Sequence, residues 1–117
     1  MYGCWRINEP DVSNTPYDVV EFQLNALNHI DEGGFDKMLL FVSEPYRLSI
    51  FNHFHQYDDT MFRSLISLTH YNIQLLIQSE ESQNAMLLVS TLDDLSFVWV
   101  LCKESGLWNT TYIYCSF

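Results

Sequence analysis

Two histidines one residue apart, His53 and His55, have a spacing that can hold a zinc ion. On an extended strand both imidazoles would point to the same side, and Asp58, Asp59 or His70 would have to supply a third ligand. The sequence has no Cys-x-x-Cys pair that would support such a site. We therefore expect exposed or hydrogen-bonded histidines, with no metal and no other cofactor.

Three cysteines, Cys4, Cys102 and Cys115, are the candidate nucleophiles. A catalytic thiol needs a base and an orienting acid in contact with it, in an exposed position. Cys102 and Cys115 instead fall in predicted strands, and the odd number without zinc-like spacing is typical of reduced, structural thiols. This pattern does not predict nucleophilic catalysis.

Adjacent carboxylates occur at Glu80-Glu81 and at Asp93-Asp94. Paired acids can perform general acid and base catalysis, but both pairs lie where turns are expected and are explained by solvation there. Gly33-Gly34 is isolated from any phosphate-binding pattern and indicates the end of a helix. The sequence therefore predicts a protein that is not an enzyme.

Charge is the clearest global signal. Fifteen acidic residues against five basic ones give a net charge of −10 and a pI near 4.4. A field of this sign repels nucleic acid and anionic membranes and accelerates encounter with a basic protein. Eight Phe, seven Tyr and three Trp are too many for one small core, so some are expected at the surface as binding anchors.

The length of 117 residues fits a single domain spanning 1–117. The sequence has no apolar run approaching the roughly 18–20 residues of a membrane span. Met1–Ile7 lacks the basic segment and apolar core of a signal peptide. Together with reduced thiols, these features predict a cytoplasmic protein.

The elements that must position any site are dominated by a C-terminal meander of four strands. Polar or turn-rich connections separate them at Ser79–Asn84, Asp93–Asp94 and Glu104–Asn109. The predicted strands are Asn72–Gln78, Ala85–Leu92, Leu95–Lys103 and Thr110–Phe117. Ala85–Val89 and Phe97–Cys102 are apolar on both faces, so both belong at the centre of the sheet and need cover on both sides.

Two main helices are predicted to pack on one face of this sheet. The first, Thr15–Glu32, has Thr15 as N-cap, Pro16 at its first position and Asp18 three residues after the cap. The second is Asp58–Thr69. The result is an α+β fold with a mainly antiparallel sheet, and its second face would be covered by sheet curvature, the N-terminal segment, a second subunit or a partner.

Two local alternatives stay open. Asp31 and Glu32 either lie at the C-terminus of the first helix, where the helix dipole disfavours them and a functional surface is indicated, or follow it in a solvated turn. Residues 44–56 either form the second strand of a hairpin with Lys37–Val42, which the alternating pattern favours, or form a helix with Pro45 in its first turn.

Carboxylates around aromatic anchors suit docking into a cationic groove, because acids guide approach and rings stabilise the complex. The candidate partner-binding residues are the acids of the first helix, the acids of two turns and two aromatic residues near the last strand: Asp18, Glu21, Asp31, Glu32, Glu80, Glu81, Asp93, Asp94, Trp108 and Tyr112. Trp108 is predicted to lie exposed in the turn before the last strand.

In whole-chain character, short, strongly acidic and without an enzyme motif or targeting signal, the sequence resembles the small immunity proteins of bacterial toxin–immunity pairs. It is also similar to phage-encoded inhibitors that imitate nucleic acid. The resemblance implies a stoichiometric inhibitor that occludes the active cleft of a basic toxin, often a nuclease.

With the hairpin, the order of elements is also similar to the cone-shaped fold of nuclear transport factor-like proteins. That resemblance implies a protein that binds or converts a small apolar ligand. The candidate lining of its pocket is Phe97, Trp99, Tyr112, Tyr114 and His70. A homodimer formed through the uncovered face of the sheet is a further alternative.

Overall fold

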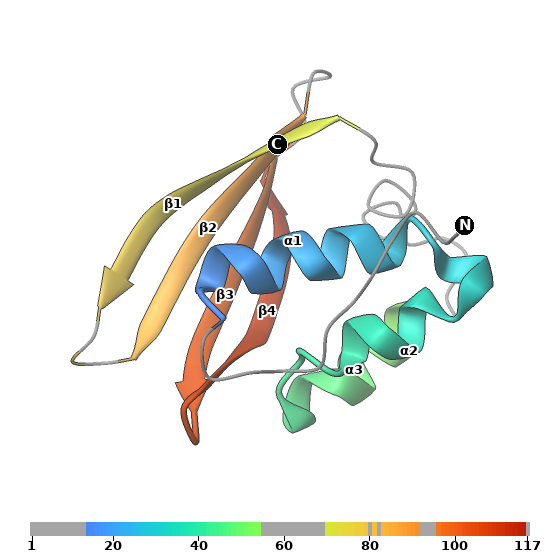
Figure 1. Ribbon diagram of the computed structural model, residues 1–117, viewed down its shortest axis with the longest axis horizontal. Helices are drawn as coiled ribbons and strands as arrows, with labels where there is room; N and C mark the ends of the chain where they lie inside the picture. Colours follow the sequence, from blue (N-terminus) through green and yellow to red (C-terminus); the bar gives the residue numbers. More distant parts are fainter. Residues whose placement is uncertain (1–13, 55–69, 80, 82, 92–95, 117) are drawn as a thin grey trace.

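The structure, a computed structural model, describes residues 14–54, 70–79, 81, 83–91 and 96–116. Helices cover one face of a four-stranded antiparallel sheet with the order β1-β2-β3-β4 (Figure 1). In chain order the elements are α1 (Pro16–Leu27), the 3-10 helix η1 (Ile30–Glu32), α2 (Gly34–Leu39), α3 (Glu44–Phe54), β1 (Tyr71–Ser79), β2 (Asn84–Thr91), β3 (Ser96–Glu104) and β4 (Leu107–Ser116). The predicted α+β class is confirmed.

The predicted meander is confirmed, with one correction in its last strand. β4 starts at Leu107 because only Ser105 and Gly106 separate it from β3. Both turn residues have positive φ, 53° and 82°, as in the two-residue turns that match the twist of a hairpin. Trp108 and Asn109, predicted to lie in a turn, are therefore strand residues.

The first helix begins as predicted and ends earlier. Thr15 Oγ1 accepts a hydrogen bond from the Asp18 amide at 3.2 Å, and the Asp18 carboxylate accepts one from the Thr15 amide at 3.0 Å. This reciprocal cap fixes the start of α1. The helix ends at Leu27, and the chain continues through η1 to Gly33, whose φ is +82°. Asp31 and Glu32 thus follow α1 in the 3-10 helix η1, where both are exposed, and do not lie at the C-terminus of α1.

The preferred hairpin of Lys37–Val42 with residues 44–56 is wrong, and its competitor, the helix, is right over the described residues Glu44–Phe54. Only the short stretch around Val42 is extended, where it makes a parallel bridge to Thr110. The Thr110 amide donates to Phe41 O at 2.7 Å, and the Ser43 amide donates to Thr110 O at 2.8 Å. The chain then enters α3 with Pro45 in the first turn, where the missing N–H costs nothing. The predicted helix Asp58–Thr69 lies outside the described residues.

The core lies between the helices and one face of the sheet. α1 packs across the strands, α2 packs on α1, and α3 packs against β4 (Figure 1). On β2 and β3 the helix-facing side chains are fully buried: Ala85, Leu87, Val89, Phe97, Trp99 and Leu101. On the opposite face Met86, Leu88 and Val100 are half-buried, and Val98 is 8% exposed. That second face is therefore apolar, as predicted, and partly accessible.

The polar side chain of Gln23 in α1 lies fully buried within this core, as does that of Thr110 in β4. Gln23 Oε1 accepts hydrogen bonds from Trp99 Nε1 at 2.8 Å and from Thr110 Oγ1 at 2.6 Å. Gln23 Nε2 donates to Met38 O at 3.2 Å. A single side-chain amide therefore joins α1, α2, β3 and β4, and its oxygen accepts two hydrogen bonds.

Replacing Gln23 with Leu should destabilise the fold by about 3 kcal/mol, because the Trp99 and Thr110 donors would lose their buried acceptor. Urea denaturation measures the free energy of unfolding. The matched control is Gln74→Leu on β1, where the amide is exposed, and it should change stability by less than about 0.5 kcal/mol. Equal unfolding midpoints for the two variants would show that the buried amide is dispensable.

The paired glycines between α1 and α2 provide a second test. Gly33 has φ +82° and open space where a Cβ would go, so Gly33→Ala should cost about 1 kcal/mol. A Cβ on Gly34 would overlap the carbonyl oxygen of Ala26 and lie 2.6 Å from that of His29. Because both obstacles are backbone atoms, Gly34→Ala should cost about 3 kcal/mol, measured by thermal or urea unfolding. The reverse ranking would contradict this close approach.

Candidate functional site

One group of acidic and tyrosine residues lies where α1 packs near the start of β1. Tyr17 and Glu21 are four residues apart on α1, hence on the same side of the helix, and both are exposed. Tyr71 at the start of β1 is half-buried beside them. The pKa of Tyr71 is raised, first by burial and then by the charge of Glu21 and the proximity of Tyr17. These three residues form what we call the Glu21 cluster.

The other helical acids have different roles. One oxygen of the Asp18 carboxylate accepts a hydrogen bond from the Thr15 amide, so Asp18 fixes the start of α1. Asp31 and Glu32 are exposed in η1, and Asp36 is exposed in the first turn of α2. The run from α1 to α2 thus presents carboxylates to solvent beyond the Glu21 cluster.

The remaining predicted partner-binding residues do not gather at one place. Glu81 is exposed in the turn after β1, and Tyr112 is exposed on the sheet face that points away from α1. Trp108 is only 7% exposed, so its prediction as an exposed anchor is wrong. Its ring points to the helix side of β4. Glu80, Asp93 and Asp94 lie outside the described residues.

Sequence reasoning missed a tyrosine cluster at the β4 edge. The Tyr112 ring centroid lies 5.5 Å from that of Tyr46 and 5.3 Å from that of Tyr114. The Tyr46 hydroxyl accepts a hydrogen bond from the Ile113 amide at 2.7 Å and donates one to Ile113 O at 3.2 Å. Tyr112 and Tyr114 share a face, as their spacing predicted. Nothing in the sequence marked Tyr46 as their partner, since it comes from α3.

The residues predicted to line an apolar pocket are not brought together. Phe97 and Trp99 are fully buried in the core, while Tyr112 and Tyr114 project from the other face of the sheet. Two buried side chains and two on the opposite face cannot line one open cavity. The ligand-binding alternative therefore loses its proposed site.

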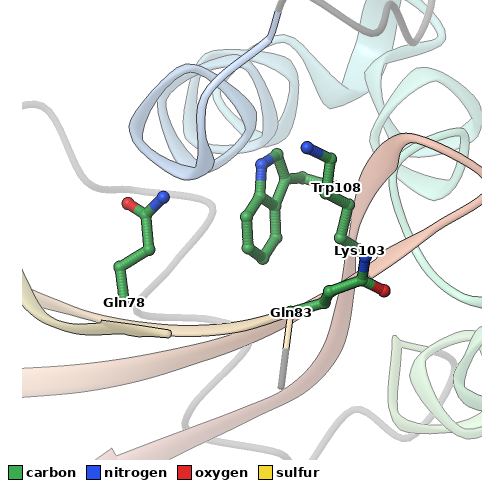
Figure 2. A pocket seen from close by; sticks show the side chains of 4 residues that line it. All are labelled: Gln78, Gln83, Lys103 and Trp108. Atoms are coloured by element: carbon green, nitrogen blue, oxygen red, sulfur yellow. The ribbon is translucent and has the colours of Figure 1, made fainter. Parts of the chain in front are cut away.

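A small open hollow of about 280 Å³ does lie at the hairpin end of the sheet. Figure 2 shows its lining, with the side chains of Gln78 and Trp108 rising from the sheet toward α1. Gln83 and Lys103 complete it, and Lys103 Nζ lies 5.8 Å from the centroid of the Trp108 ring. Because that cation covers the indole, the hollow offers amide and ammonium groups rather than an aromatic platform.

The described residues contain no group of three or more His, Cys, Asp or Glu side chains placed to bind a metal ion. His53 lies in α3 rather than on a strand, and His55 is outside the described residues. Among the described helices, none has the length and apolar character needed to cross a membrane.

Comparisons with protein-family models, with curated proteins and with solved structures found no match. The function must therefore be argued from the charge and geometry of this chain.

The Glu21 cluster predicts a specific titration. Replacing Glu21 with Gln should lower the pKa of Tyr71, which should still stay above its ordinary value of 10.0 because burial is the larger cause. The pKa of Tyr71 is raised in the folded state and not in the unfolded chain. The resulting contribution to the free energy of unfolding is therefore fully present below pH 10 and is lost as the pH rises through the raised pKa. NMR of labelled tyrosine rings follows the titration. The control is Glu104→Gln, which replaces an exposed acid of β3 and should leave the pKa of Tyr71 unchanged. An unchanged pKa of Tyr71 in Glu21→Gln would show that Glu21 does not act on Tyr71.

Proposed function

We propose that this chain is an acidic protein-binding inhibitor without chemistry of its own, an immunity protein of a bacterial toxin–immunity pair. Its partner is a basic, nuclease-type toxin domain whose active cleft it occludes in the cytoplasm. The observation that carries the proposal is the Glu21 cluster: an exposed carboxylate on the same side of α1 as the exposed Tyr17 and close enough to raise the pKa of Tyr71, in a chain of net charge −10.

The cluster combines the two components that a protein interface with a cationic groove needs. Glu21 and the acids of η1 and α2 attract a basic surface from a distance and raise the association rate. Tyr17 supplies a large exposed ring, and Tyr71 is half-buried and packs against the core. Tyrosine anchors of this kind commonly contribute most of the binding energy.

Hydrogen bonds hold the scaffold under this surface together, which suits a stoichiometric inhibitor. The capping box fixes the start of α1, and the buried Gln23 fixes its middle against α2 and two strands. A surface that needs no rearrangement loses little conformational entropy on binding. Tight occlusion of a cleft is therefore compatible with an interface of modest size.

The test begins with a partner captured by the immobilised protein from lysate of the source cell at low salt and identified by mass spectrometry. Purified, this partner should be basic and cleave nucleic acid, and an equimolar amount of the inhibitor should abolish the cleavage. Reversing Glu21, Asp31 and Glu32 to Lys should lower the association rate at least about tenfold. Asp18 is left intact so that the cap of α1 survives.

The matched control reverses three other exposed acids, Glu44, Glu81 and Glu104, and changes the net charge by the same amount. It should reduce the association rate less than the first variant does. Equal association rates for the two variants would show that the helical acids are not the docking surface. A captured nuclease that stays fully active in the complex would contradict the proposal that this chain is an inhibitor.

A further inference from the structure

The two edge strands of the sheet differ in whether their outer backbone groups are hydrogen-bonded. The β4 edge is covered, because its Thr110 and Ile113 backbone groups bond to Phe41, Ser43 and the Tyr46 hydroxyl. β1 is the other edge strand, with β2 on one side and, among the described residues, no strand on the other (Figure 1). An open edge presents backbone donors and acceptors to any strand that can align with it.

The nine residues of β1 lack two of the features that protect an edge from association, a charged side chain and a proline. Leu75, Leu76 and Ile77 are consecutive and are 49%, 44% and 59% exposed. They lie at the register shift between Leu75 and Ile77, so their side chains expose apolar surface on more than one side of the strand. Three adjacent exposed aliphatic residues at a strand edge predict an interface.

We propose that a second copy of this chain pairs with β1, antiparallel and edge to edge, about a two-fold axis near Leu76. Such pairing continues the sheet across both copies and brings the exposed aliphatic residues of the two strands together. This inference does not depend on the proposed toxin partner, because it uses a different surface.

The absence of charge on β1 favours an uncharged strand at this edge over a charged one, and β1 of a second copy is such a strand. Each copy has a net charge of −10, yet β1 itself places no acid opposite another acid. Exposed His70 precedes the strand and exposed Glu81 follows it. Antiparallel pairing therefore brings the His70 end of one copy to the Glu81 end of the other.

Salt should affect this association and partner binding in opposite directions. The overall repulsion between two acidic copies is screened by salt, while the contact itself is apolar, so self-association should strengthen as salt is added. Attraction between opposite charges, as in the proposed toxin complex, should weaken. Failure of one proposal is therefore distinguishable from failure of the other.

Sedimentation velocity of the full chain over a range of concentrations tests the pairing. The wild type should reach twice its mass of 13.8 kDa, at lower concentration in high salt than in low salt. Ile77→Lys should raise the dimer dissociation constant at least about tenfold, because the strand would then carry a charge into an apolar contact. The matched control is Leu48→Lys at an aliphatic residue of α3 that is 67% exposed, and it should not change the constant.

Hydrogen exchange of the wild type provides a measurement that needs no variant. Amides of β1 should exchange more slowly as the protein concentration rises, while those of α3 should not change. A wild type that stays monomeric at every concentration would overturn the proposal. So would a dimer that Ile77→Lys and Leu48→Lys weaken equally, and so would an edge protected only when another protein is added.

Discussion

The buried amide of Gln23 is the interaction on which the rest of this structure depends. One oxygen accepts from Trp99 at the centre of the sheet and from Thr110 near its edge, and one nitrogen donates to the backbone of α2. Thr110 in turn bonds through its backbone to Phe41 and Ser43, which lead into α3. Since Glu21 lies two residues before Gln23, burying the amide turns the carboxylate to another side of α1, toward solvent. The fold and the candidate site are therefore set by the same contact.

The molecule presents two surfaces of different chemistry. The run from α1 to α2 carries exposed carboxylates, one of which, Glu21, lies near tyrosines, and this combination suits a basic partner. β1 carries only uncharged residues and exposed aliphatic ones, which suits a surface of the same kind. The tyrosines Tyr46, Tyr112 and Tyr114 instead serve the opposite edge, where Tyr46 bonds to the Ile113 backbone. Aromatic residues in this chain thus act both as candidate anchors and as protection for an edge.

Local patterns predicted the strands and the start of α1 well, because alternation, turn residues and the Thr15–Asp18 cap are signals between near neighbours. The predicted hairpin failed because Tyr46 and Ile50, four residues apart, can also share one side of a helix, with Leu48 left exposed. The choice between the two depends on contacts with Thr110 in a distant strand. Trp108 was misplaced because a two-residue turn lengthened β4. Gln23 could not be predicted as a buried hub, since its partners Trp99 and Thr110 lie 76 and 87 residues away along the chain.

The most direct measurement of the central claim is the association rate with the captured basic partner as a function of ionic strength, by stopped-flow fluorescence. If exposed carboxylates on the helices guide docking and tyrosines hold the complex, the association rate falls steeply with salt while the dissociation rate changes little. An association rate that does not depend on salt would contradict an acidic docking surface.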